Sequence, residues 1–163
     1  MLNEKETYEF YKNHLSNFKT VLKDTNNNLV TANDCDYNCM SYALGVFDEW
    51  LEIDSFRCTF LKEEEVLNDV FCDCCNELEE RFAVRRLSGP AASLEANERL
   101  IAFRIGYDDF HFVRQNSDGS WTHKPGWDYI REMSEGELFD DSWCENSRCY
   151  PYISEIAFFA VKI

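Results

Sequence analysis

The chain has 163 residues and a formal net charge of −15, from 31 acidic and 16 basic side chains. Hydrophobic residues make up 45% of it and aromatic residues 15%, which is enough for one globular core and argues against disorder. Nucleic acid and anionic membranes would repel so acidic a surface, and we expect neither as a partner.

The start of the chain, MLNEKETYEFYKNHL, lacks the basic and apolar regions of a signal peptide, and no apolar run reaches membrane-spanning length. We therefore expect a cytoplasmic protein, although the mature form of an exported effector would share these features. In a reducing cytosol the eight cysteines are expected as free thiols or ligands, because a domain of this size needs no disulfide framework.

Apolar residues recur every three or four positions in three segments of the first half, and each segment predicts a helix. The first covers 4–23 and is followed by a loop, KDTNNNLVTAND. The second begins after Asn38, a residue type that caps helices, and its apolar face would carry Cys39, Ala43, Val46, Phe47 and Trp50. The third covers 62–80, and its buried side would carry Leu67, Phe71, Cys74 and Leu78.

The second half of the chain changes to the alternation of β-strands. RFAVRRL, RLIAFRIG and FHFVRQ alternate, and YISEIAFFAVKI predicts a closing strand that is buried on both faces. Helices first and antiparallel strands second are typical of an α+β domain. We expect residues 1–163 to form a single domain of this class.

Two of the three histidines, His111 and His123, lie on either side of the turn-like segment NSDG. This segment suits a type I turn that begins at Asn116 and ends with Gly119 in a left-handed conformation. Pairing Asn116 with the residue after the turn sets Val113 opposite His123 and makes the two imidazoles diagonal neighbours on one sheet face. We expect them within hydrogen-bonding reach; the alternative is two surface histidines on a polar strand face.

Cys39 is the candidate nucleophile. It falls in the expected first turn of a helix, where the dipole and the backbone N–H groups favour a thiolate and could receive an oxyanion. A thiolate is a strong nucleophile once a neighbouring imidazole holds its proton. Taken alone, Cys39 would more simply be a small buried apolar residue.

NCMSYALG, followed by DFHFVRQNSDGSWTHKPG, resembles the Cys-His-His arrangement of NlpC-type peptidases within the papain-like superfamily. More narrowly, the two segments are similar to a group of mainly bacterial proteins. Those proteins pair an N-C-x-x-Y-A-L segment with a D-x-H-x-x-R-Q-x-S-D-G-x-W-x-H-K-P-G hairpin. Nearly every fixed position of the hairpin pattern is filled here.

The resemblance implies an NlpC-like, papain-like fold in which N-terminal helices pack on an antiparallel sheet. It implies a cysteine hydrolase, a thiol protease or amidase that cleaves an amide bond of a protein or peptide. Cys39 would be the nucleophile, His111 the base, and His123 the group that orients His111. Asp128 is the rival for the orienting role.

Two asparagines are further candidates for binding the oxyanion or the substrate. Asn33 lies six residues before Cys39, the spacing at which papain-like enzymes hold an oxyanion-stabilising amide, and Asn38 lies directly before it. The chain departs from the peptidoglycan peptidases, which usually follow the cysteine with Ser-Gly and place a glycine soon after the first histidine. Met-Ser and Phe-Val stand there instead. The mechanism is therefore expected without the peptidoglycan substrate.

Other functions stay open. The same triad could deamidate glutamine or transfer an acyl group to an amine, and an acidic binding or inhibitor protein could use the scaffold without catalysis. We expect no metal or other cofactor, because Cys72, Cys74 and Cys75 would point in different directions from one helix, and CENSRC at 144–149 lacks the C-x-x-C spacing of zinc knuckles. The acidic run over 128–145 could flank the site and favour basic substrates, although solvation explains it more simply.

Overall fold

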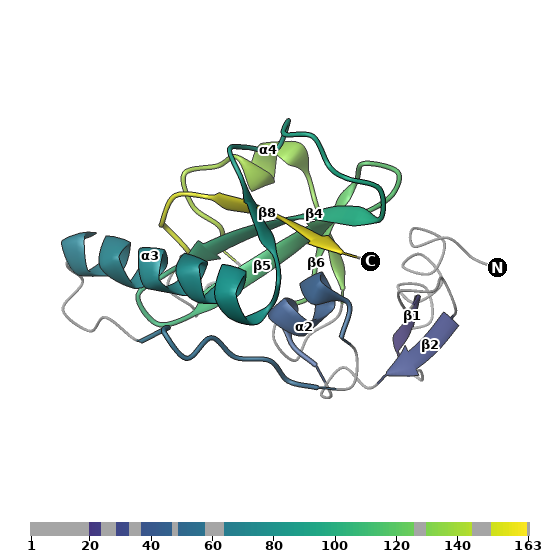
Figure 1. Cartoon of the computed structure of the whole chain (residues 1–163), viewed down its shortest axis with the longest axis horizontal. Coiled ribbons are helices and arrows are strands. Elements are labelled where there is room, and N and C mark those ends of the chain that lie inside the picture. Colours follow the sequence, from purple (N-terminus) through teal and green to yellow (C-terminus); the bar gives the residue numbers. More distant parts are fainter. Residues whose placement is uncertain are drawn as a thin grey trace.

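The computed structural model describes residues 20–23, 29–32, 37–46, 49–57, 64–125, 130–144 and 151–162. Within this part of the chain it contains helices, a six-stranded antiparallel sheet and a small two-stranded sheet (Figure 1). The α+β class predicted from the sequence is therefore confirmed.

The six-stranded sheet has the order β3-β8-β4-β5-β6-β7, and all neighbouring strands are antiparallel. From β4 to β7 the chain forms each strand beside the previous one, whereas β8 returns to lie between β3 and β4 (Figure 1). The strands are β3 (Arg85–Leu87), β4 (Glu98–Ile105), β5 (Phe110–Gln115), β6 (Trp121–His123), β7 (Arg131–Met133) and β8 (Ala157–Lys162).

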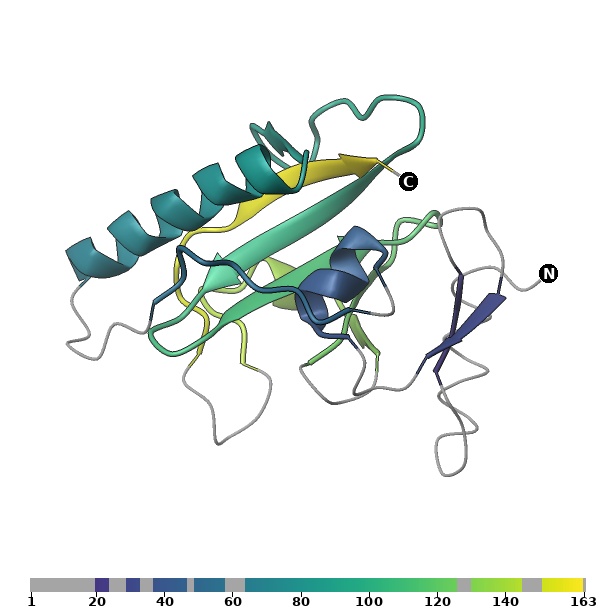
Figure 2. The ribbon, with the colours of Figure 1, turned by 60° about the horizontal axis from the view of Figure 1, so that its bottom comes forward.

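One face of the sheet packs against α2 (Cys39–Leu44) and α3 (Glu64–Arg81). α3 lies along β8 and β4 (Figure 2). Phe71 of α3 stacks on Phe103 of β4 with ring centroids 5.9 Å apart, and Phe103 lies 4.7 Å from Phe112 of β5. Because burial of one such ring contributes about 1.5–3 kcal/mol, this aromatic core is a main attachment of the helices to the sheet.

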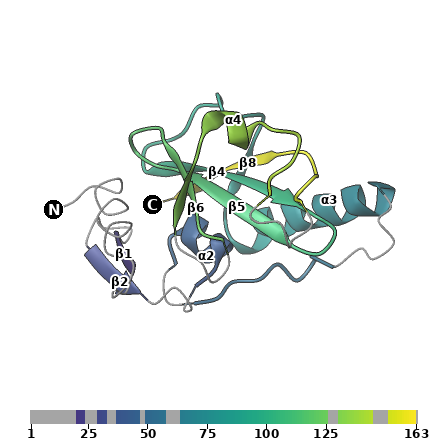
Figure 3. The same cartoon turned by 180° about the vertical axis from the view of Figure 1, so that it is seen from behind.

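The opposite face of the sheet is covered by α4 (Glu135–Leu138) and by the segments that carry Trp143 and Tyr152 (Figure 3). Trp143 and Tyr152 exchange two backbone hydrogen bonds, of 3.0 and 2.9 Å. His111 belongs to this face, because strand residues alternate and its neighbour Phe112 packs under the helices. The sheet thus separates a helical core from a second core that contains the histidines.

The first predicted helix, over 4–23, is wrong at its C-terminal end. Thr20–Lys23 form strand β1, which pairs antiparallel with β2 (Leu29–Ala32), and β2 falls in the segment predicted as a loop. Both strands contain β-branched residues, and the Asn-rich segment between them is typical of a turn. These residue types outweigh the helical spacing. Residues 4–19 lie outside the described part of the chain.

The second predicted helix is shorter than its apolar spacing indicates. α2 ends at Leu44, because Gly45 adopts a left-handed conformation with φ 78° and its N–H donates back to the last turn. Val46 and Trp50 therefore lie beyond the helix, and Phe47 lies outside the described residues.

The third predicted helix is confirmed with small changes of boundary, and the closing strand is confirmed from Ala157 onward, whereas residues 152–156 of YISEIAFFAVKI lie before it. Glu64–Arg81 replaces 62–80, and the four residues expected on its inner side are buried. β8 is buried on both faces, since alternate residues of it belong to the two cores.

Other expected strands differ more. In RFAVRRL only the last three residues form a strand, because Arg81 still ends α3. β7 and α4 both lie within the acidic run over 128–145, where the sequence indicated no element. α4 is fixed by a capping box between Ser134 and Glu137. A helix of four residues is too short to show helical periodicity in the sequence.

Gly106 allows two distant parts of the chain to meet. A Cβ at this position would lie 2.7 Å from the carbonyl oxygen of Pro151, closer than real Cβ atoms approach backbone. The close passage lets the Ile105 carbonyl accept hydrogen bonds of 3.0 Å from the N–H groups of Ile153 and Ser154. It thereby holds the segment that brings Tyr152 onto the sheet.

We predict that Gly106→Ala lowers the free energy of unfolding by about 1–3 kcal/mol, because the added methyl group forces the two backbones apart. Gly89→Ala is the control, since a Cβ there meets nothing within 4 Å. Urea unfolding of both variants measures the difference, and equal losses would contradict the prediction.

Candidate active site

β5 and β6 form the predicted hairpin. Val113 pairs with His123, and the Asn116 N–H donates to the Ser120 carbonyl at 2.7 Å. The Gly119 N–H donates to the Asn116 carbonyl at 2.9 Å, and Gly119 has a φ of 85°. The predicted turn and register are confirmed.

The two imidazoles of this hairpin lie in direct contact. His111 Nε2 is 2.8 Å from His123 Nδ1, and the rings stand at 86° to each other with both side chains buried. Burial, together with the positive charges of His111 and Arg131, holds the pKa of His123 well below its ordinary value of 6.5. His123 is therefore a neutral ring at physiological pH.

The charge of His111 decides the direction of this hydrogen bond. Between two neutral rings either nitrogen can carry the hydrogen. A protonated His111 carries hydrogen on both ring nitrogens, so its Nε2 then donates and His123 Nδ1 accepts. His123 thus holds the ring of His111 in one orientation, with Nδ1 as the nitrogen left for other partners.

Two aromatic side chains hold the His111 ring from the other side. Tyr152 stacks on it with centroids 5.2 Å apart and an interplanar angle of 23°, and Trp143 meets it edge-on at 6.2 Å. Trp143 is fixed in turn by its indole N–H, which donates to the Leu138 carbonyl at 2.8 Å. The ring of His111 is thereby enclosed as well as oriented.

Arg104 is a buried cross-strand neighbour of His111 that ties these segments together. Its Nε donates to the Ser154 carbonyl at 2.8 Å, and its Nη1 donates to the Asp140 carbonyl at the same distance. Its guanidinium lies 5.4 Å from the centre of the Trp143 ring. These contacts connect the segments that carry Trp143 and Tyr152 to β4, the strand beside His111.

Cys39 begins α2, and Asn38 is its N-cap as predicted. Asn38 Oδ1 accepts from the Ser41 N–H at 3.0 Å, and its Nδ2 donates to the Leu51 carbonyl at 2.6 Å. Cys39 is 5% exposed, and its Sγ lies 3.9 Å from the carbonyl oxygen of Phe110. The amide of Asn38 is therefore engaged in holding the backbone around Cys39.

Cys39 lies beside β5 at the open end of the hairpin. β6 pairs with β5 only from Val113 onward, so Phe110 and His111 extend beyond the end of β6. α2 packs on the Phe112 side of the sheet, and Cys39 reaches the backbone of β5 next to His111. The thiol and the imidazole thus lie on the two faces of the sheet, at the same end of β5.

Residues of the two sequence motifs dock α2 onto the hairpin. The Arg114 guanidinium lies 4.6 Å from the centre of the Tyr42 ring, and its Nη1 donates to the Tyr42 carbonyl at 3.3 Å. The Tyr42 hydroxyl is 2.8 Å from Thr122 Oγ1, which donates to Asn116 Oδ1 at 3.2 Å. These buried contacts explain why a tyrosine three residues after the cysteine accompanies an arginine three residues after the histidine.

A second connection lies just before Cys39. The Nζ of Lys124, a fully buried residue next to His123, is 4.7 Å from the centre of the buried Tyr37 ring. Tyr37 precedes α2, and Lys124 follows β6. This cation–π contact therefore links the segment before Cys39 to the segment after His123.

Cys39 and His111 line the same cavity, of about 280 Å³. Its wall also includes residues of 49–57, the loop before β5 and the segment before β8. The other lining residues are Asn38, Trp50, Glu52, Ile53, Phe56, Asp109, Phe110 and Tyr152.

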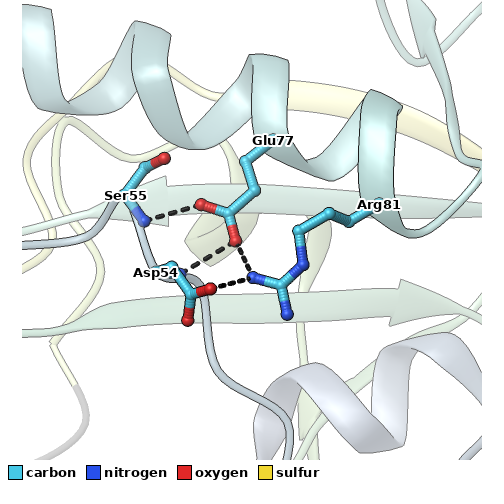
Figure 4. Close-up of polar contacts among 4 residues, drawn as sticks. All are labelled: Asp54, Ser55, Glu77 and Arg81. Carbon is cyan, nitrogen blue, oxygen red and sulfur yellow. Dashed lines mark hydrogen bonds and ion pairs between the residues drawn. The ribbon is translucent and has the colours of Figure 1, made fainter.

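Glu77 of α3 anchors the wall formed by residues 49–57 (Figure 4). Its carboxylate is 8% exposed and accepts from the backbone N–H groups of Asp54 at 2.9 Å and Ser55 at 2.6 Å. Arg81 bonds both Glu77 and Asp54, the latter at 2.8 Å. Burial alone raises the pKa of Glu77, but the hydrogen bonds from Ser55, Asp54 and Arg81 outweigh it and hold the pKa below the ordinary 4.5.

Of the candidate residues, His111 contacts His123, and Cys39 lines the same cavity as His111. Asn33 and Asp128 lie outside the described residues. Sequence reasoning missed Arg104, Trp143 and Tyr152, whose importance depends on packing between distant segments.

No described helix is long and apolar enough to cross a membrane. Among the described residues, no group of three or more histidine, cysteine or acidic side chains is arranged to hold a metal ion.

Fold and site together define an α+β domain with a buried histidine pair beside a cysteine. The family whose model matches residues 28–143 is described as "Domain of unknown function (DUF7689)", and the chain belongs to this family. No curated protein and no solved structure matches the chain.

We predict that His123 stays neutral to a lower pH than an ordinary histidine does, because its pKa is lowered. Its burial and its contact with His111 are the reasons. Long-range ¹⁵N–¹H spectra of the histidine rings measure both tautomer and charge. Protonation of His123 before His111 would contradict the prediction.

We predict that Glu77→Gln lowers the free energy of unfolding by about 1–3 kcal/mol at neutral pH, since it removes a charged acceptor from three donors. A carboxylate whose pKa is lowered on folding stabilises above its unfolded pKa, near 4.5, and loses this effect as the pH falls through the folded pKa. The difference from the wild type should therefore shrink in acid.

The matched control for this measurement is Glu80→Gln, an exposed position on the same helix. Urea unfolding at several pH values compares the three proteins. A loss in Glu77→Gln that stays constant from neutral to acid pH would show that the charge is not the cause.

Proposed function

We propose that this protein is a cysteine hydrolase of papain-like type that cleaves an amide bond of a protein or peptide. The observation that carries the proposal is the 2.8 Å contact between His111 and His123, with His111 and Cys39 lining one cavity. Thiol-dependent acyl transfer requires a nucleophile, a base beside it, and a group that orients the base. The NlpC-type resemblance of the two motifs supports the same assignment.

The reaction begins with proton transfer from Cys39 to His111 Nδ1. The thiol lies beside the Phe110 carbonyl, one residue from His111, and the reaction requires it to turn to the imidazole. Sγ then attacks the carbonyl carbon of the substrate, and the negative charge develops on the carbonyl oxygen. The backbone N–H groups at the start of α2, next to Cys39, would donate to that oxygen.

The intermediate collapses when His111 returns its proton to the leaving amine. The carbon–nitrogen bond breaks, and the acyl group stays on Cys39 as a thioester. Water, deprotonated by His111, attacks the thioester, and the carbon–sulfur bond breaks. The carboxylic acid leaves as the product, and the proton held by His111 regenerates the thiol of Cys39.

His123 serves as a neutral orienting group in this proposal. The mechanism requires His111 Nε2 to donate to His123 Nδ1 in both charge states of His111, and this hydrogen bond would keep the ring in one orientation during turnover. A neutral acceptor stabilises the imidazolium of His111 less than a carboxylate would. Its main contribution is then geometric.

We predict that a thiol-directed alkylating agent modifies Cys39 ahead of the other cysteines at mildly acidic pH. Burial raises the pKa of Cys74 and of Cys75 to about 12, so these two thiols stay protonated and slow. Iodoacetamide labelling, followed by peptide mapping, measures the order. Labelling of Cys39 no faster than of the exposed Cys72 and Cys144 would contradict the proposal.

The variants separate the roles within the triad. Cys39→Ser should abolish the fast labelling, and His111→Ala should slow labelling of Cys39 by about a hundredfold, the lower range of acid–base contributions. His123→Ala should slow it less, and Asp128→Ala should have little effect. A large loss in Asp128→Ala with none in His123→Ala would assign the orienting role to the carboxylate. Thermal unfolding of each variant checks that the fold is kept.

A further inference from the structure

The cavity beside Cys39 has a wall of distinct chemistry. Two carboxylates, of Glu52 and Asp109, lie on it, and among the described residues that line it none is lysine or arginine. Four aromatic side chains complete the wall: Trp50, Phe56, Phe110 and Tyr152. Trp50 is 36% exposed, which is unusual for so large an apolar residue.

Both carboxylates stand on backbone that is fixed to the site. Asp109 Oδ1 accepts from the Phe110 N–H at 2.8 Å, and its Oδ2 accepts from the Tyr152 hydroxyl at 3.1 Å. Tyr152 is the ring that stacks on His111. Asp109 is therefore held at a set position next to the proposed base.

Glu52 is held through its neighbours. The Leu51 N–H donates to Ser41 Oγ at 3.0 Å, and its carbonyl accepts from Asn38 Nδ2 at 2.6 Å, so the residue before Glu52 is tied to α2. The residue after it, Ile53, is buried. The exposed side chain of Glu52 thus extends from a fixed segment beside the nucleophile.

Carboxylates beside aromatic faces recognise cations. An ammonium or guanidinium gains Coulomb attraction from the carboxylates and cation–π attraction from the rings, while its alkyl stem packs on apolar surface. An anionic group in this cavity would meet repulsion from both carboxylates. The formal charge of −15 on the chain adds attraction for cations at longer range.

We propose that the amide substrate carries a positive charge next to the bond that is cleaved, such as a lysine or arginine side chain or a polyamine. Glu52 and Asp109 are its specificity-determining residues, with Trp50 as the aromatic surface. This inference rests on the proposed function, because it assigns the substrate class of the same site.

The test compares methanethiosulfonate reagents that differ in charge: trimethylammonioethyl (positive), methyl (neutral) and sulfonatoethyl (negative). The cysteine thiolate attacks the sulfenyl sulfur, a disulfide forms, and methanesulfinate leaves, so no other reactant is needed. Rates are measured by peptide mapping of the full chain at Cys39 and at the exposed Cys72. The modification rate with the positive reagent is divided by the rate with the negative reagent at each cysteine. The value of this ratio at Cys72 corrects for the overall charge of the protein.

We predict that this ratio is at least about tenfold larger at Cys39 than at Cys72, because two carboxylates lie near the thiol. Glu52→Gln and Asp109→Asn should each lower the ratio at Cys39 by roughly threefold, and the neutral reagent should change little. Glu80→Gln, which removes one exposed charge that does not line the cavity, is the control and should leave the ratio unchanged.

A second measurement concerns the substrate itself. N-acetyl-lysine N-methylamide should protect Cys39 from the neutral reagent at a lower concentration than the norleucine analogue, which has the same stem without the charge. Equal protection by the two, or equal reagent ratios at Cys39 and Cys72, would overturn the cationic substrate class and leave the hydrolase proposal standing. A Cys39 that the neutral reagent leaves unmodified while it labels Cys72 would overturn the proposed function.

Discussion

The hydrogen bond between His111 and His123 is the constraint on which the rest of the site depends. Burying two imidazoles away from water is unfavourable unless their polar atoms are paired, and this contact satisfies one nitrogen of each ring. Tyr152 and Trp143 pack on the ring of His111, and burial holds the pKa of His123 well below its ordinary value. The packing around the pair therefore opposes protonation of His123.

The cysteine, in contrast, owes its position to tertiary contacts. α2 has six residues, far fewer than a helix needs to persist in isolation. Tyr42 is its main attachment, through Arg114 on one side and Thr122 on the other. The motif residues around the nucleophile and around the histidines are thus parts of one interface, which explains why they occur together in the sequence.

The sequence predicts the hairpin well because turn chemistry at Asn116 and Gly119 and the even spacing of the histidines leave one register. It predicts α3 because eighteen residues carry a long periodic signal. It does not reveal that Glu77 holds a loop more than twenty residues earlier, or that Tyr152 reaches His111. Contacts of this kind depend on the three-dimensional arrangement, which no local pattern encodes. The end of α2 was misjudged because apolar spacing continued past Gly45.

The position of β8 has a consequence for how the molecule forms. β8 pairs with β4 and with β3, whose partner residues precede it by 54 to 64 and by 71 to 75 positions. During synthesis β4 and β5 can pair early, but the centre of the sheet stays incomplete until residue 162 has been made. Until then the apolar edge of β4 is open to strands of other molecules. The protein therefore completes its sheet late, when β8 joins β3 to β4, and any chain that stops before β8 exposes an aggregation-prone edge.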